Sequence, residues 1–115
     1  MIRSAPTNFD PMNALAEHAV KVLENRNGQV KVKELAEQLG VSRRTLERLF
    51  AEHVGVAPKK FARILHFQNS LTTLRARRFR DSAELAFACG YSDQSHLIKD
   101  FKALTGRLPS QLSSF

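Results

Sequence analysis

Two stretches of this sequence follow one pattern: ELAEQLGVSRRTLERLF at residues 34–50, and ELAFACGYSDQSHLIKDF at residues 84–101. Each begins with Glu-Leu-Ala, has a glycine six residues after the glutamate, and ends on a leucine followed four residues later by phenylalanine. The second stretch has one extra residue between the glycine and that leucine. A Gly-x-x-Pro spacing then follows each stretch, at Gly55 and Pro58 and again at Gly106 and Pro109. A repeat with this many fixed spacings predicts two similar structural units in one chain.

The pattern of each copy is typical of a helix-turn-helix, in which two short helices cross at a steep angle. In the first copy, Leu35, Leu39 and Leu46 supply the faces that the two helices bury. Ala36 is small where the second helix must approach closely, and Gly40 permits the positive φ that the turn requires.

Capping and turn residues predict helices along the rest of the chain. Asp10 before Pro11 is a favourable helix start, because Asp accepts from unpaired backbone N–H groups and Pro fits the first helical position. A capping box is expected where Asp81 and Glu84 begin another helix. Residues 30–32, Val-Lys-Val, are the only short strand candidate. The expected helices span about residues 11–26, 33–39, 43–54, 58–75, 82–89 and 93–104, with a last short turn from residue 109.

The expected fold is therefore all-α, with about seven helices forming two helix-turn-helix subdomains that are joined by a long linker helix. The apolar stripe of the linker is wide, which predicts that this helix packs against more than one neighbour. The expected organisation is a disordered N-terminal segment at 1–9, a first subdomain at 10–56, the linker helix and a basic connection at 57–80, and a second subdomain at 81–115.

The 115 residues include 18 Lys and Arg against 11 Asp and Glu, which gives a formal net charge of +7. The excess lies in the middle of the chain, because residues 43–80 contain ten cations and two anions while the flanking segments are close to neutral. Such a basic block favours an anionic partner, with nucleic acid ahead of a membrane surface.

Several classes of protein are excluded. The single cysteine cannot form an intramolecular disulfide framework or a cysteine-based zinc site. No apolar run is long enough to cross a bilayer, and the N-terminal residues lack the apolar region of a secretory signal, so we expect a cytoplasmic protein without a membrane partner. Glu34 and Glu84 occupy matching positions, but no nucleophile or metal-ligand cluster accompanies them. We therefore expect no enzyme activity, no metal and no cofactor.

The second helix of each copy contains the candidate DNA-reading residues. With Leu46 at the centre of the buried face, Arg44 and Arg48 point outward one turn apart, and arginine binds guanine O6 and N7 in the major groove. In the second copy, Gln94 can bind adenine and Ile98 can contact a thymine methyl group. The predicted base contacts are Arg43, Arg44, Glu47, Arg48, Gln94, Ser95, His96, Ile98 and Lys99. The predicted phosphate contacts are Ser42, Thr45, Lys59, Lys60, Arg78, Ser92 and Lys102.

From about Leu15 to Leu112, the chain resembles the DNA-binding domain of AraC/XylS-type transcriptional regulators. The motifs that match are LGVSRRTLERLF at residues 39–50, the second copy from Ala86 to Phe101, and both Gly-x-x-Pro spacings. The resemblance implies seven helices, with two recognition helices that enter successive major grooves on one face of the duplex. The linker helix departs from the family, which usually has arginine and then a small residue where this chain has His66 and Ser70.

The resemblance implies a sequence-specific regulator of transcription that binds double-stranded DNA, with activators the commonest members of the family. We expect this chain to be the DNA-binding part of a longer, effector-responsive regulator, and to be monomeric because it already contains two reading heads. The alternative is a protein-interaction module that docks on an acidic partner such as RNA polymerase.

Other polar and aromatic residues have simpler interpretations. The basic run at residues 75–80 is either a phosphate clamp or a solvated helix end, since helix C-termini favour cations. His18, His53 and His66 are interpreted as packing or surface residues, and Cys89 as a small buried hydrophobic residue. The phenylalanines are interpreted as core residues.

Overall fold

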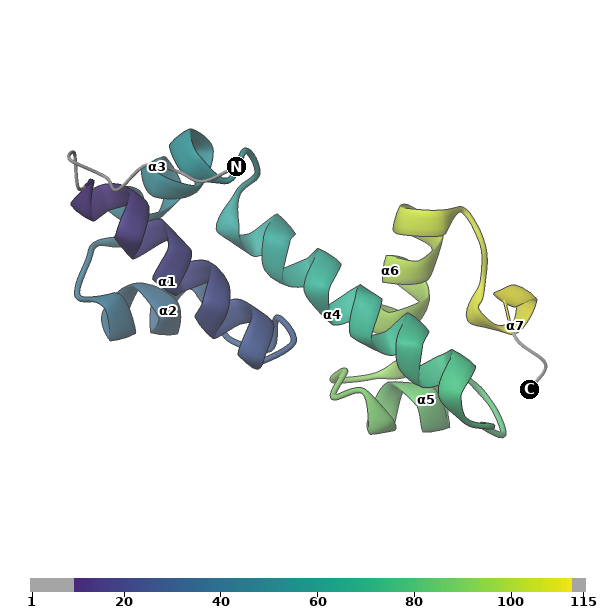
Figure 1. Ribbon diagram of the computed structural model, residues 1–115. Coiled ribbons are helices and arrows are strands. Elements are labelled where there is room, and N and C mark those ends of the chain that lie inside the picture. The colour runs from purple at the N-terminus through teal and green to yellow at the C-terminus, as the bar shows by residue number, and fades with distance from the viewer. Residues whose placement is uncertain (1–9, 113–115) are drawn as a thin grey trace.

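The computed structural model describes residues 10–112, and every regular element within that range is a helix (Figure 1). In chain order the helices are α1 (Pro11–Asn25), α2 (Val32–Leu39), α3 (Arg43–His53), α4 (Pro58–Ala76), α5 (Ser82–Ala88), α6 (Gln94–Thr105) and α7 (Pro109–Leu112). This arrangement confirms the expected all-α fold. Residues 30–32 are not a strand, because Val30 is a buried residue of the turn that leads into α2. The predicted disordered segment at residues 1–9 lies outside the described residues.

The described part of the chain is elongated, with extents of 54 × 34 × 21 Å. Helices α1–α3 form a unit at one end, α5–α7 form a unit at the other end, and α4 runs diagonally between them (Figure 1). None of the helices between residues 10 and 112 combines the length and apolar character that crossing a membrane requires.

Four helices begin at a polar residue whose side chain accepts a hydrogen bond from the first turn. Asp10, Ser42, Asp81 and Asp93 each accept from a backbone N–H two or three residues later, at 2.9–3.0 Å. These bonds pair N–H groups that have no partner inside the helix, and so they fix where the helices start.

The capping box expected at the start of α5 differs from the prediction in one of its two hydrogen bonds. Asp81 accepts from the N–H of Glu84 as expected, but the Glu84 carboxylate accepts from the N–H of Arg80, at 2.7 Å, and not from that of Asp81. The Arg80 guanidinium also pairs with the other oxygen of Glu84, at 3.3 Å. The Glu84 carboxylate thus bonds the N–H of Arg80, the residue before the cap Asp81, and it also forms the ion pair with the Arg80 side chain.

Two glycines are required where the helices turn. Gly40 has a φ of 71° at the end of α2, which confirms its predicted role in the first helix-turn-helix. Gly28 has a φ of 75°, and a Cβ atom on it would lie 2.0 Å from the backbone oxygen of Ala62. The turn between α1 and α2 therefore packs directly on the backbone of α4, and only glycine fits there.

The buried side chains form two separate clusters. The first consists of Ala19, Leu23, Val30, Leu35, Ala36, Leu46, Phe50 and Ala62. The second consists of Phe67, Leu74, Phe79, Leu85, Ala86, Cys89, Leu97 and Phe101. Helix α4 contributes to both clusters, with Ala62 in the first and Phe67 and Leu74 in the second. The prediction that the linker helix packs against several neighbours is confirmed, as is the burial of Cys89.

The interpretation of every phenylalanine as a core residue is wrong for Phe87, whose exposed fraction is 88%. The seven residues of α5 bury Leu85 and Ala86 against the second cluster. Phe87 follows them by about 100° around the helix, which turns its ring toward solvent. A helix as short as α5 buries only the residues on the side that faces the second cluster. Helical spacing therefore does not place all of its apolar residues in the core.

Candidate nucleic-acid interface

Helix α3 presents a charged face to solvent because its large apolar residues face inward. Leu46, Leu49 and Phe50 are buried, whereas Arg44 and Arg48 are exposed. These two arginines lie four residues apart, so their guanidinium groups share one face of the helix. This is the geometry that the sequence predicts for a helix lying in the major groove.

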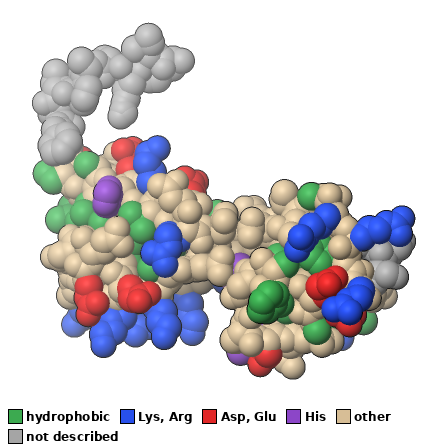
Figure 2. Space-filling view, turned by 90° about the horizontal axis from the view of Figure 1, so that it is seen from below, with side chains coloured by type: hydrophobic (Ala, Val, Ile, Leu, Met, Phe, Trp, Pro, Cys, Tyr) green, Lys and Arg blue, Asp and Glu red, His purple; other side chains and the backbone are tan. Residues whose placement is uncertain are grey.

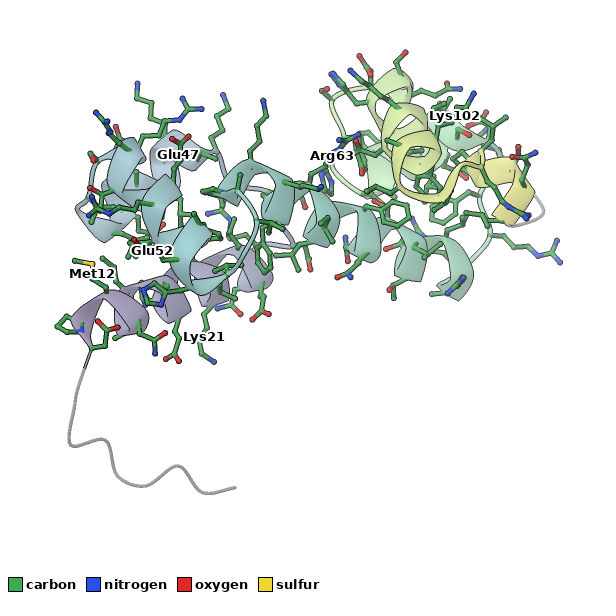
Figure 3. All side chains as sticks on the ribbon, turned by 90° about the horizontal axis from the view of Figure 1, so that it is seen from above. Met12, Lys21, Glu47, Glu52, Arg63 and Lys102 are labelled. Atoms are coloured by element: carbon green, nitrogen blue, oxygen red, sulfur yellow. The ribbon has the colours of Figure 1, made fainter. Side chains whose placement is uncertain are left out.

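The predicted base contacts Arg43 and Glu47 also lie on this exposed surface, where they form an ion pair at 3.7 Å. An exposed pair of this kind contributes little to stability, so either side chain can exchange it for another partner. In Figure 3, Glu47 and the basic side chains around it point away from the side of the molecule that carries Lys21 of α1.

At the start of α3, the two hydroxyl groups predicted to bind phosphate are bonded to each other. The Ser42 hydroxyl accepts from the Thr45 N–H at 3.0 Å and donates to Thr45 Oγ1 at 2.9 Å. Because the Ser42 proton is used in this bond, the hydroxyl proton of Thr45 is the one that remains available to an acceptor outside the protein. Ser42 is exposed and Thr45 is half-buried.

Helix α6 presents a less basic face. Gln94, Ser95, His96 and Lys99 are exposed, and Ile98 is half-buried. The His96 ring is held at the start of the helix, because its Nδ1 lies 2.6 Å from the hydroxyl of Ser92 and 3.4 Å from a carboxylate oxygen of Asp93. Lys102, one turn further along, is also exposed.

The remaining predicted phosphate contacts lie around α4. Lys59 and Lys60 are exposed in its first turn, and Arg78 is exposed beyond its last. Two arginines of the basic run have partners within the protein: the guanidinium of Arg77 lies 4.6 Å from the centre of the Phe79 ring, and Arg80 pairs with Glu84. Arg75 and Arg78 could therefore bind phosphate at this end without giving up such a contact.

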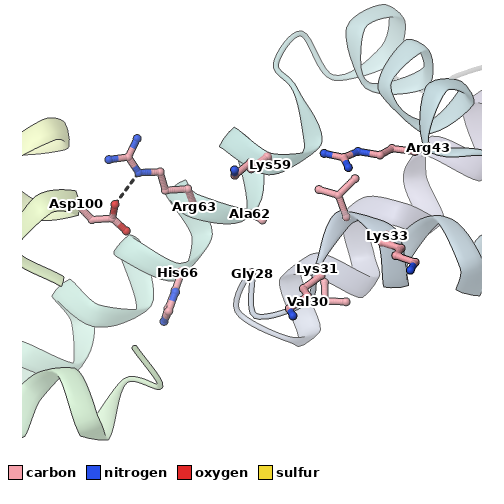
Figure 4. Close-up of a pocket in the computed structure, with 11 residues that line it drawn as sticks. Gly28, Val30, Lys31, Lys33, Arg43, Lys59, Ala62, Arg63, His66 and Asp100 are labelled. Atoms are coloured by element: carbon pink, nitrogen blue, oxygen red, sulfur yellow. Dashed lines mark hydrogen bonds and ion pairs between the residues drawn. The ribbon is translucent and has the colours of Figure 1, made fainter. Parts of the chain in front are cut away.

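A basic cleft of about 450 Å³ lies between the first unit and α4, and among the residues that the structure describes there, Asp100 is the one lining residue from the second unit (Figure 4). Its charged lining includes two predicted contacts, Arg43 and Lys59, and three cations that the sequence did not single out: Lys31, Lys33 and Arg63. The two lysines lie in a part of the chain with no net charge, so they do not stand out as a basic block in the sequence. Only the structure brings them to the cleft, through their place at the start of α2 next to the turn that contains the buried Val30.

Lysine and arginine side chains gather along one edge of the unit that contains α1–α3, whereas on the other unit acidic, basic and apolar groups alternate (Figure 2). The cations of the first unit thus lie together on one edge, although residues 10–57 contain as many acidic as basic side chains. Within residues 10–112, no three His, Cys, Asp or Glu side chains come together in a way that could hold a metal ion.

Two family models match the chain. One, described as a helix-turn-helix domain, covers residues 35–114, and the other, described as an HTH domain, covers residues 16–51.

Curated relatives match over about two thirds of the chain. The HTH-type transcriptional activator RhaS of Pectobacterium atrosepticum is 31% identical over 83 residues, which are 68% of this chain and 28% of the relative. The HTH-type transcriptional regulator CdhR of Pseudomonas aeruginosa is 33% identical over 78 residues, or 68% of this chain and 23% of the relative. The chain thus spans less than a third of the length of these two proteins.

Solved structures match over nearly the whole chain. A transcriptional regulator with an AraC-type DNA-binding domain from Chromobacterium violaceum has a TM-score of 0.73 at 25% identity, covering 86% of this chain and 88% of that one. The DNA-binding domain of AdpA, solved in complex with a target DNA, has a TM-score of 0.70 at 25% identity, covering 90% and 89%.

Proposed function

Because this chain belongs to the AraC-type family of helix-turn-helix domains and is a sequence-specific DNA-binding domain of a transcription regulator, we propose that α3 and α6 read two adjacent segments of major groove. The observation that carries this proposal is that both repeats leave the same face of the second helix exposed. Arg44 and Arg48 occupy that face on α3, and Ser95 and Lys99 lie at the corresponding positions of α6, with Gln94 at the flank.

The two heads would read DNA by different chemistry. On α3, Arg44 and Arg48 suit guanine, with Arg43 and Glu47 at the flank of the same surface. On α6, Gln94 suits adenine and the half-buried Ile98 suits a thymine methyl group, while Ser95, His96 and Lys99 supply polar contacts. The first head therefore favours a G·C-containing segment, and the second relies more on amide and apolar contacts.

Phosphate contacts would hold both heads in register on the duplex. Ser42, Thr45, Lys59 and Lys60 lie near the first head, and Ser92 and Lys102 near the second. The basic cleft adds Lys31 and Lys33 between the heads, where the DNA backbone would cross from one major groove to the next. Arg78 would contact phosphate beyond the end of α4.

The relatives support a proposal about the rest of the regulator. The matched segments are 28% and 23% of these two proteins, so the chain would be the DNA-binding part of a longer, effector-responsive regulator in the cytoplasm. The activator name of RhaS favours activation, with RNA polymerase as a further partner. Since the chain contains two reading heads, it would bind an asymmetric site as a monomer. A family of transcription regulators is not a class of enzymes.

Selection of bound duplexes from a random pool tests the base-reading role. Arg44→Ala and Arg48→Ala should each relax discrimination at one base pair by about 1–3 kcal/mol, because each removes one guanine contact. Lys21→Ala is the matched control, since it removes one exposed positive charge from α1, on the opposite side of the molecule.

The measurement is the affinity for the selected duplex and for each single-base variant of it. The control should leave discrimination unchanged. If Arg44→Ala and Arg48→Ala weaken binding equally on selected and random DNA, neither arginine reads bases.

A further inference from the structure

Helix α4 is the element that the two hydrophobic clusters share. Its residues Ala62 and Leu65 pack with the first cluster, and Phe67 and Leu71 pack with the second. His66 therefore lies where the helix passes from one core to the other. How firmly the second unit is attached to α4 determines where α6 lies relative to α3.

An ion pair joins α4 directly to the second recognition helix. Arg63 Nε donates to Asp100 Oδ1 at 2.6 Å, with side-chain exposed fractions of 39% for the arginine and 15% for the aspartate (Figure 4). Asp100 follows the predicted base contact Lys99 on α6. Because the carboxylate is largely shielded from water, this pair is less screened than the exposed pairs Arg43–Glu47 and Arg80–Glu84.

The second oxygen of the same carboxylate is also bonded. Tyr91, in the turn between α5 and α6, donates its hydroxyl to Asp100 Oδ2 at 3.1 Å. Burial raises the pKa of the Tyr91 phenol, so the group keeps the proton that it donates. Asp100 thus connects α6 both to α4 and to the preceding turn.

His66 attaches the same turn to α4 from the other side. Its ring stacks on the Tyr91 ring, with centroids 4.0 Å apart and planes at 12°. Its Nε2 lies 2.7 Å from the backbone oxygen of Cys89, in hydrogen-bond contact. The linker helix therefore makes a polar contact at the position where it departs from the family, and the contact runs to the turn of the second helix-turn-helix.

We propose that Asp100, bonded to Arg63 and Tyr91, is a positioning residue that fixes α6 against α4 and thereby restricts the spacing between the two DNA segments that the domain accepts. This inference rests on the proposed function. One extra base pair moves the second segment by about 3.4 Å along the duplex and turns it by about 34°. A firmly attached α6 cannot follow that displacement, whereas a loosely attached one can. Weaker attachment of α6 should also lower the affinity at the native spacing, because the additional orientations of α6 must be given up when DNA binds.

The test compares duplexes in which the selected segments are separated by the native spacing, by one base pair more and by one base pair fewer. The native protein should lose at least about tenfold in affinity at either altered spacing, which is comparable with the cost of one mismatched base pair. Asp100→Asn keeps the shape of the side chain but removes its charge, and should reduce that ratio to about threefold.

Arg63→Gln should act in the same direction as Asp100→Asn. Because Asp100→Asn removes no cation, agreement between the two variants separates the ion pair from any phosphate contact of Arg63. Arg80→Gln is the matched control, since it breaks an ion pair of the second unit whose arginine is 85% exposed, and it should leave the ratio as it is in the native protein. If Asp100→Asn does not fold, Tyr91→Phe, which removes only the hydroxyl, takes its place.

A second measurement needs no DNA. Spin labels on Glu52→Cys of α3 and Ala103→Cys of α6, both exposed positions, report the distribution of distances between the heads. The native cysteine is replaced by Cys89→Ala, which keeps the backbone oxygen that His66 contacts. Asp100→Asn should broaden this distribution.

An unchanged spacing ratio or an unchanged width of the distance distribution would overturn the positioning role. A failure of the proposed function gives a different result, because selection then yields no duplex with two recognised segments. In that case the distance distribution decides by itself whether Asp100 positions α6.

Discussion

Phe79 and Phe87 show how residues of one type take different roles in this chain. Phe79 is 5% exposed and lies beneath the guanidinium of Arg77, although it belongs to the connection between α4 and α5. Phe87 lies inside a helix and is 88% exposed. Membership of a helix therefore does not decide which ring belongs to the core. For Phe87, what matters is which side of α5 faces the second cluster, because its ring lies on the other side.

Alanine at these two positions should have very different effects on the free energy of unfolding. Phe79→Ala leaves a cavity beneath Arg77 and should cost about 3–5 kcal/mol. Phe87→Ala removes no buried contact and should change stability by at most about 0.5 kcal/mol. Urea denaturation followed by circular dichroism measures both. Equal destabilisation would show that Phe87 is packed in solution.

The recognition helices begin in the same way but with different side chains. α3 starts at Ser42 and α6 at Asp93, and each cap accepts from a backbone N–H three residues later. Each cap is also close to a predicted DNA contact, since Ser42 bonds Thr45 and Asp93 lies 3.4 Å from His96 Nδ1. The capping residues therefore help to order the ends of the helices that would approach the DNA.

Removing either cap should destabilise the domain. Ser42→Ala and Asp93→Ala should each lower the free energy of unfolding by about 1 kcal/mol, because an N–H group of the first turn loses its acceptor. Gln38→Ala, at an exposed position of α2, serves as the control and should be close to neutral. Thermal and urea denaturation give the values. A neutral Asp93→Ala would mean that the bond from the His96 N–H does not hold the start of α6.

Across the whole molecule, the two units differ in where their cations lie, although they share a repeat. The basic edge seen in Figure 2 belongs to the unit that contains α1–α3, and the cleft beside it adds Lys31, Lys33 and Lys59. On α6, the exposed cations Lys99 and Lys102 are accompanied by Asp93 at its start. The electrostatic part of DNA binding should therefore come mainly from the first head and α4.

Salt dependence tests this asymmetry. Replacing Lys59 and Lys60 together by Gln should flatten the plot of log affinity against log salt by about 0.9 for each phosphate that the protein no longer neutralises. The matched variant replaces Lys99 and Lys102 by Gln, removes the same charge, and should flatten the plot less. Equal or reversed changes would contradict an electrostatic term concentrated at the first head.

The sequence by itself determined the helices and their order. Their apolar spacing, capping residues and turn glycines act within a few residues, so the repeat predicts both helix-turn-helix units and the linker between them. The same local geometry places Arg44 and Arg48 on the exposed face of α3, because the buried face of that helix is defined by Leu46. The α5 capping box departs from the prediction, because Glu84 bonds both the N–H and the guanidinium of Arg80.

Tertiary structure alone decided which distant residues meet. The pairing of Arg63 with Asp100, the stacking of His66 on Tyr91 and the gathering of Lys31 with Lys59 at one cleft all join segments that are far apart in the sequence. The exposure of Phe87 likewise depends on which side of α5 meets α4 and α6. Such contacts depend on the angles at which helices cross, and those angles come from the packing of both cores around α4, which no local pattern encodes.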